Sequence, residues 1–391
     1  MFSNRLPWNA SVNRITAAVG SRRLSGQELI DLTETNPTRA GLPWPGEELG
    51  EALRRGAMAR YRPDPGGLVS AREAIAVFLT ERGESVSPSD LVLTASTSEA
   101  YAWIFKCLGD AGDEILTALP SYPLLENLAR LEDLTLRHFP LELDRRWRLD
   151  AAAVSSAMNR HTRAVVVIHP GNPAGNYFQP EEQRELTNLC AAHSCALIAD
   201  EVFFDYPVEA TAAVSFAETG GECLTFALGG LSKSAGFPHL KLSWIRLSGP
   251  EDLCHRAHNA LESVGDNYLS LSTPVQSALA EILQIGAAMR ASIRARTAEN
   301  MSILRRTFAG LPAARVLPVE GGWSAVIRVP SILSDEEFAI HLLETTGVLV
   351  SPGYFFDFSS EGYLVVSLIC EPGEFQQGAT RLRDFIVELI D

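Results

Sequence analysis

Seven short apolar runs, most of them separated by stretches with helical spacing, occupy the chain between residues 91 and 247. The runs cover residues 91–95, 114–118, 134–139, 163–169, 196–200, 223–228 and 242–247. Continuous apolar runs indicate strands that are buried on both faces, and alternation with helices indicates βαβ units. We therefore predict an α/β protein with a largely parallel seven-stranded sheet that is covered by helices.

The segments that flank this alternation predict a second, smaller domain. Residues 251–391 combine helical stretches with strands in an α+β pattern. Residues 1–45 are rich in Arg, Asn and Pro and predict an irregular arm, which we expect to pack with the C-terminal part. We assign residues 46–265 to the large domain, and residues 1–45 with 266–391 to the arm and the small domain.

Composition excludes several classes of protein. With 391 residues, 46% of them hydrophobic, the chain is neither disordered nor fibrous. Its net charge of -15 disfavours nucleic acid and anionic membranes as partners. The six cysteines form no C-x-x-C motif, so we predict neither a disulfide scaffold nor a metal site. Because the sequence has neither an apolar leader nor a run of 18 apolar residues, we expect a cytoplasmic protein.

Polar residues at the ends of two predicted strands are candidates for ligand binding, since ligands of open α/β sheets bind beyond the carboxyl ends of strands. Ser96 and Thr97 lie between a strand and a helix, where free N–H groups and hydroxyls can bind an anion. An ordinary helix N-cap would also explain them. Asn172 follows the strand at 163–169, and its amide can donate to a ligand oxygen or simply form an Asn-Pro turn.

Two charged residues follow two other strands. Asp200 ends the run 196–200, and burial of a carboxylate there is costly unless it is paired. A protonated ring nitrogen, a helix N–H or a salt bridge could be the partner. Lys233 lies among Gly, Ser, Leu and Phe, where desolvation would favour the neutral amine that forms a Schiff base. A lysine in a loop is otherwise usually a solvated charge.

The order of these residues along the chain narrows the kinds of ligand that they could bind together. Asn172, Asp200 and Lys233 end different strands of one sheet and can therefore face one crevice. An amine nucleophile, a carboxylate for a ring nitrogen, an amide for a ring oxygen and a phosphate cup together describe pyridoxal phosphate.

With the motifs Asn172-Pro-Ala-Gly175, Asp200-Glu201 and Ser232-Lys233 in this order, the chain resembles the class I/II aminotransferases, which are fold-type-I pyridoxal-phosphate enzymes. The resemblance extends from about Asp31 to the C-terminus. It implies that Lys233 forms a Schiff base with the cofactor and transfers a proton. It also implies that Asp200 pairs with the pyridine nitrogen and that Asn172 bonds to the ring 3-oxygen.

The resemblance assigns further residues to the cofactor. Tyr122 matches the aromatic residue that stacks on the ring. Ser96, Thr97 and Ser232 match the phosphate cup. Tyr61 matches a tyrosine that reaches the phosphate of the neighbouring subunit, which implies a homodimer with shared active sites.

Three positions depart from the pattern of the family. Phe203 replaces a tyrosine that bonds to the 3-oxygen, and Lys241 replaces an arginine at the phosphate; we still assign both to the cofactor. Val365 falls where the family has the arginine for the substrate carboxylate. Arg39 in the arm, with Asn36 nearby, is our candidate for that role, although Arg39 could equally be a solvated loop residue. Otherwise the substrate lacks a carboxylate there, or the reaction is not transamination.

We therefore predict a pyridoxal-phosphate-dependent aminotransferase that takes an amino acid or amine as donor and a keto acid as acceptor. A decarboxylase, lyase or oxidase on the same scaffold is the alternative. A non-catalytic sensor of the cofactor is disfavoured, because about 30 residues before the core are too few for a DNA-binding module and the chain is acidic.

Overall fold

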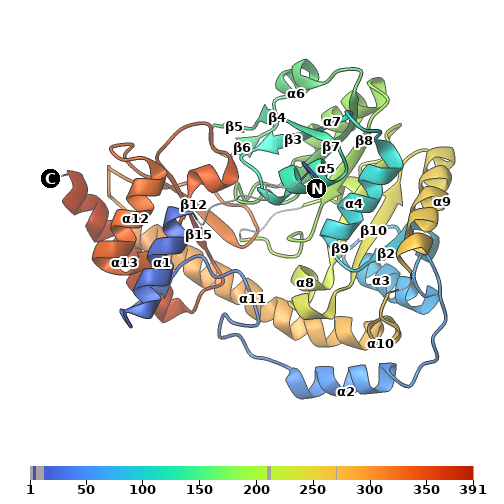
Figure 1. The fold of residues 1–391 in the computed structure, drawn as a ribbon, viewed down its shortest axis with the longest axis horizontal. Helices are drawn as coiled ribbons and strands as arrows, with labels where there is room; N and C mark the ends of the chain where they lie inside the picture. Colours follow the sequence, from blue (N-terminus) through green and yellow to red (C-terminus); the bar gives the residue numbers. More distant parts are fainter. Residues whose placement is uncertain (1–2, 6–12, 209–212, 270, 391) are drawn as a thin grey trace.

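A seven-stranded sheet forms the centre of the computed structural model, which describes residues 3–5, 13–208, 213–269 and 271–390 (Figure 1). In spatial order its strands are β2 (Leu91–Thr94), β10 (Ser243–Ser248), β9 (Thr225–Gly230), β8 (Ala196–Asp200), β7 (Thr162–Ile168), β3 (Glu114–Leu119) and β4 (Thr135–Pro140). Only β10 runs antiparallel to its neighbours. The predicted α/β class is confirmed, and each of the seven apolar runs overlaps one strand.

Helices cover both faces of this sheet. Along β8, Ile198 packs with α4 (Thr97–Leu108), α5 (Leu124–Leu131) and α9 (Glu251–Tyr268). On the opposite face, the helices are α6 (Ala151–Ala157) and α7 (Pro180–Ala192). Leu197 and Ala199 of β8 belong to the cluster on that second face. Because successive strand residues point to opposite faces, both sets of β8 residues are apolar, and β8 is an apolar run up to Asp200. The edge strand β4 is mostly exposed and carries Arg137 and His138.

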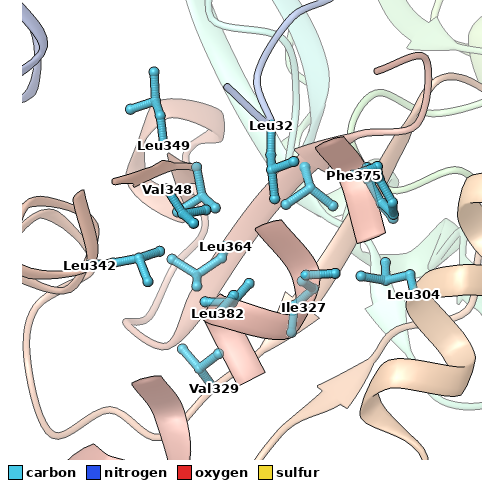
Figure 2. Packing of buried hydrophobic residues seen from close by; sticks show 14 of the residues in the cluster. Leu32, Leu304, Ile327, Val329, Leu342, Val348, Leu349, Leu364, Phe375 and Leu382 are labelled. Atoms are coloured by element: carbon cyan, nitrogen blue, oxygen red, sulfur yellow. The ribbon is translucent and has the colours of Figure 1, made fainter. Parts of the chain in front are cut away.

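A smaller four-stranded sheet forms from the C-terminal part of the chain. Its order is β11 (Arg315–Val316), β12 (Ser324–Arg328), β15 (Tyr363–Ser367) and β14 (Ser351–Pro352). It packs with α12 (Asp335–Thr346) and α13 (Pro372–Ile390) around a core that includes Ile327, Leu364 and Phe375 (Figure 2). Leu32, from near the N-terminus, belongs to the same core, and β1 (Ile30–Asp31) pairs in parallel with β13 (Val348–Leu349).

The long helix α11 (Leu279–Phe308) connects the two parts (Figure 1). Its N-terminal half is buried against helices below the large sheet, and its C-terminal half joins the core of the smaller part. The other elements of the described chain are α2 (Gly46–Gly56), α3 (Val69–Glu81), α8 (Leu231–Ser234), α10 (Thr273–Ser277), β5 (Glu142–Leu143), β6 (Trp147–Arg148) and four short 3-10 turns. Within the described ranges, no helix has the length and apolar character needed to cross a bilayer.

The N-terminal segment is not entirely irregular, so this part of the prediction is wrong. Helix α1 spans Arg14–Leu24 and packs against α12. The Asn13 side chain caps it by accepting from the Thr16 N–H at 2.7 Å, which satisfies one of the free donors of the first turn. Ile15 is its one buried residue, so the helix has almost no apolar stripe for a sequence pattern to show. Residues 1–2 and 6–12 of the predicted arm lie outside the described residues.

Candidate active site

The four predicted strand ends lie at one edge of the large sheet. Asp200 is the last residue of β8, and Asn172 follows the adjacent strand β7. Ser96 and Thr97 follow β2 at the start of α4, and Lys233 follows β9 in the short helix α8. Because β2, β7, β8 and β9 run in the same direction, their carboxyl ends form a common edge, as is usual for ligand sites in α/β sheets.

Lys233 is half-buried among aromatic side chains. Its Nζ lies 4.7 Å from the centre of the Trp323 ring and 5.4 Å from the centre of the Phe203 ring. Burial lowers the pKa of Lys233 from 10.5 to about 8, although the charge of Asp200 acts in the opposite direction. The Tyr206 hydroxyl donates to the Lys233 carbonyl oxygen and fixes the backbone. This lysine is therefore not a solvated loop charge, and a sizeable fraction is a neutral, nucleophilic amine near pH 8.

Asp200 is a buried carboxylate with neutral hydrogen-bond donors. Oδ1 accepts from the Val202 N–H at 3.1 Å, and Oδ2 accepts from the Tyr101 hydroxyl at 3.0 Å. Its side chain forms no ion pair within 4.0 Å in the described part of the chain. Burial raises the pKa of Asp200 to about 6, while the two hydrogen bonds and Lys233 oppose this shift. The carboxylate thus retains capacity to bind a cationic donor from a ligand.

Hydroxyl groups and one cation surround a cavity of about 190 Å³ beside these residues. The predicted phosphate residues all line it, and they are Ser96, Thr97, Ser232 and Lys241. Ser96 is also the N-cap of α4, with its Oγ accepting from the Glu99 N–H at 3.1 Å, so both explanations of this serine hold. The N-terminal end of a 12-residue helix carries partial positive charge, which favours an anion at this position.

The backbone around Lys233 is constrained by its neighbours on β10. A Cβ added to Gly229 would lie 2.4 Å from the Trp244 ring, and one added to Gly230 would lie 2.3 Å from the Ser243 Oγ. Only glycine therefore fits where β9 leads into α8. Lys241 has the left-handed backbone angle φ of +50°, which is uncommon for residues other than glycine and is found more often at functional sites.

Asn172 and Tyr122 lie near the same edge. The Ser324 hydroxyl, on β12 of the smaller sheet, lies 3.4 Å from Asn172 Oδ1 in hydrogen-bonding geometry. Tyr122 is 45% exposed, and its pKa is raised by partial burial and by the charge of Asp200. Asn172 thus connects the large sheet to the smaller one, and Tyr122 is within electrostatic reach of Asp200.

The structure does not bring Tyr61, Asn36 and Arg39 into this group. Tyr61 is 66% exposed between α2 and α3. The Arg39 side chain is 70% exposed and pairs with Glu34 at 3.3 Å. Asn36 Oδ1 accepts from the N–H of Thr38 at 3.0 Å and from its hydroxyl at 2.8 Å, which closes a local turn.

Val365 is 3% exposed and belongs to the hydrophobic cluster on the face of the large sheet that α6 and α7 cover. It pairs with Val326 on β12 and Ser351 on β14, so this stretch of strand is uncharged. The position that resembles the family's substrate arginine is thus occupied by a packed apolar side chain.

Sequence reasoning missed four residues around the site: Ser98, Ser243, Tyr101 and Trp323. Ser98 continues the hydroxyl run of Ser96 and Thr97, so that run could have found it. Tyr101 lies one helical turn after Thr97, a spacing that places it on the same face of α4. Trp323 is 90 residues from Lys233 in sequence, and no local pattern indicates their contact.

The donor set fits the parts of pyridoxal phosphate. A phosphate monoester fits a hydroxyl-lined cavity that has a lysine and a helix N-terminus beside it. A basic ring nitrogen fits the buried Asp200 carboxylate, and an aldehyde carbon fits the amine of Lys233.

The chain is similar to known proteins along almost its full length. The family model described as "Aminotransferase class I and II" matches residues 27–382. A glutamate-pyruvate aminotransferase of Haemophilus influenzae is 24% identical over 368 residues, which is 92% of this chain and 91% of the relative. A tyrosine aminotransferase of Caenorhabditis elegans is 24% identical over 92% of this chain and 78% of the relative. Among solved structures, alanine aminotransferase from Pyrococcus furiosus has a TM-score of 0.90 at 21% identity, covering 99% of this chain and 100% of that one.

Proposed function

The chain belongs to the class I and II aminotransferase family, and from this premise we propose that it uses pyridoxal phosphate, held at the edge of the large sheet, to move an amino group from an amino acid or amine to a keto acid. It is an aminotransferase, as are the relatives that it matches over most of their length. The observation that carries the proposal is the desolvated amine of Lys233 within electrostatic reach of the buried carboxylate of Asp200.

Each part of the site has one task in this proposal. The hydroxyls of Ser96, Thr97 and Ser232, with the Lys241 ammonium, hold the phosphate. Asp200 would pair with the pyridine nitrogen and keep a proton on it, and Asn172 would donate to the ring oxygen. Tyr122 would stack on the ring, and Phe203 would lie at the ring oxygen, where it supplies contact but no hydrogen bond.

The cofactor, when bound, supplies an electron-withdrawing ring that stabilises negative charge at the substrate Cα. The protein supplies the proton transfer. Lys233 would hold the cofactor through its aldehyde carbon, and its free amine would accept the Cα proton of the substrate and donate it again. A pKa of about 8 suits both directions near neutral pH, because a general base works best when its pKa is close to the working pH. The rings of Trp323 and Phe203 cover part of this amine.

Arg39 is proposed as the ligand of the substrate carboxylate. The Ser367 hydroxyl donates to the Glu34 carbonyl oxygen at 2.6 Å, and the Ser367 N–H donates to that of Leu32, so the arm lies along the end of β15. This supports the role because β15 carries Val365, where the resemblance places the missing arginine. The pair between Arg39 and Glu34 is exposed and worth little, so a substrate carboxylate can replace Glu34.

We also propose a homodimer in the cytoplasm, with residues 46–265 as the large domain. The exposure of Tyr61 and Tyr268 supports the homodimer, since a subunit interface would cover these side chains. The six free thiols support a reducing compartment.

A lysine-mapping experiment tests the proposal. The chain has only three lysines, Lys106, Lys233 and Lys241. We expect the purified protein to absorb visible light, and borohydride reduction to fix the cofactor to the peptide that contains Lys233. A panel of amino acids and amines should then bleach this absorbance and yield the amine form of the cofactor. Attachment to another lysine, or release of CO₂ or use of O₂ in place of amino transfer, contradicts the proposal.

A further inference from the structure

Tyr101 connects the two ends of the candidate cofactor site, the Asp200 carboxylate and the hydroxyl-lined cavity at the start of α4. Its hydroxyl donates to Asp200 Oδ2 at 3.0 Å, and the ring is buried with 4% exposure. It lies in α4, whose first residues are the hydroxyl donors of the phosphate cavity. Tyr101 follows Thr97 by four residues, which is about 6 Å along the helix axis.

The helix α4 is itself rigidly placed. Ala100, Trp103, Ile104 and Phe105 are buried in the cluster that covers the sheet. A hydroxyl on this helix therefore has a fixed position relative to β8. The Tyr101 ring also contacts Phe105, with ring centres 5.8 Å apart. The geometry restricts the Asp200 carboxylate to one orientation, since the Val202 N–H holds its other oxygen.

We propose that Tyr101 is a positioning residue that orients Asp200 and keeps its proton affinity low, so that the shared proton stays on the pyridine nitrogen of the cofactor. The inference rests on the proposed function, because it concerns the same site. A proton between two bases resides on the more basic one, and a hydrogen bond donated to a carboxylate makes that carboxylate less basic. Without the hydroxyl, the proton moves toward Asp200 and the ring withdraws fewer electrons.

The other groups that face Asp200 do not replace this bond. Lys233 on α8 favours the ionised carboxylate through its charge, but this amine is consumed when it bonds to the cofactor. The charge of Asp200 helps to raise the pKa of Tyr122, which lies on the loop before α5, but Tyr122 forms no described hydrogen bond to Asp200. The Val202 N–H, two residues after Asp200, is a backbone donor that already bonds to the other carboxylate oxygen, Oδ1. Tyr101 is thus the side-chain donor that remains in the holoenzyme.

The test replaces the hydroxyl and observes the ring nitrogen directly. Tyr101→Phe holoenzyme is loaded with pyridoxal phosphate that carries ¹⁵N in the ring, and the nitrogen chemical shift is followed between pH 6 and 9. Tyr177→Phe is the matched control, because Tyr177 is equally buried and donates to the Phe204 carbonyl oxygen at 2.9 Å. Tyr101→Leu serves if the Phe variant does not fold.

We expect the wild type and Tyr177→Phe to show a protonated ring nitrogen across this range. Tyr101→Phe should shift toward the value of neutral pyridine, and its kcat should fall about tenfold, the factor that corresponds to a change of one pKa unit. Cofactor that binds to Lys233 in both variants with the same ring-nitrogen shift overturns this inference and leaves the proposed function intact. A wild type that does not bind the cofactor overturns both.

Discussion

Burial of Lys233 makes the cofactor-free protein less stable than it would be with a neutral residue at this position. The pKa of Lys233 is lowered from 10.5 to about 8 by desolvation. Since one pKa unit corresponds to about 1.4 kcal/mol, the charged lysine costs about 3 kcal/mol of folding free energy at pH 7. Lys233→Met removes the charge and retains the apolar stem, so we expect the unfolding free energy of the apoprotein to rise by up to that amount.

The pH dependence gives this prediction its sign. Between pH 8 and 10.5 the unfolded chain binds more protons at this lysine than the folded chain, so the stability of the wild type rises with pH there. The gain in Lys233→Met is therefore complete below pH 8 and disappears as the pH approaches 10.5. Because Lys233 also attracts Asp200, the same comparison in an Asp200→Asn background isolates the desolvation of the lysine.

Calorimetry of the apoprotein is the assay. An unfolding entropy of about 2.1 cal/mol/K per residue gives roughly 0.8 kcal/mol/K for 391 residues, so 3 kcal/mol raises the midpoint by about 4 °C. Lys106→Met is the control, because Lys106 is part of a surface ion pair with Glu132 and its loss should lower the midpoint slightly. A Lys233→Met protein that melts no higher than the wild type at pH 7, or whose gain is equal at pH 7 and 10.5, refutes the reasoning.

Three other substitutions test the phosphate site, the substrate site and the backbone. Lys241→Ala should weaken binding of pyridoxal phosphate about 10- to 100-fold and leave that of pyridoxal unchanged, because a hydrogen bond to a charged group contributes about 1.5–3 kcal/mol; titration calorimetry with both ligands measures this. Arg39→Ala should raise KM about tenfold or more for amino acids and not for amines without a carboxylate; equal changes for both would remove Arg39 from the substrate site. Gly230→Ala should lose about 1–3 kcal/mol in denaturant unfolding, since its Cβ collides with Ser243, whereas Gly20→Ala, with open space around it, should lose nothing.

The sequence predicts the large sheet well because its central strands β7, β8 and β9 are buried on both faces. Apolar runs as short as 164–168, with helical stretches between them, favour strands over helices because they are too short for a helix. Helix α1 was missed for the opposite reason, since its single buried residue, Ile15, leaves no periodic signal. Its capping residue Asn13 could have marked the start.

The sequence predicts those site residues that come directly after an apolar strand. Asp200 and Lys233 stand out because a charge at the end of an apolar run needs a partner. The same rule cannot find Trp323 or Tyr101. Trp323 reaches Lys233 only through the packing of the smaller part on the larger, and Tyr101 occupies a position on α4 that an apolar residue would also suit.

The adjacent buried carboxylates of Asp200 and Glu201 differ in their partners, which distinguishes a carboxylate that stabilises the fold from one that is available to a ligand. Glu201 is 2% exposed, and its Oε1 accepts from the Ser215 hydroxyl at 3.0 Å and the Phe216 N–H at 2.8 Å. Its Oε2 pairs with the half-buried Arg82 at 3.4 Å. Glu201 therefore has a permanent cation as well as neutral donors, and nothing further is needed to satisfy it.

Asp200, one residue earlier, has neutral donors and no permanent cation. Burial raises the pKa of both carboxyl groups, so the difference between them lies in their partners. In the part of the chain that the structure describes, Lys233 is the cation whose charge lowers the pKa of Asp200, and its amine is the group proposed to react with the cofactor. A carboxylate that served only the fold would be paired as Glu201 is. The incomplete pairing of Asp200 makes the apoprotein less stable, and it leaves a cationic ring nitrogen as the ligand that this position binds most favourably.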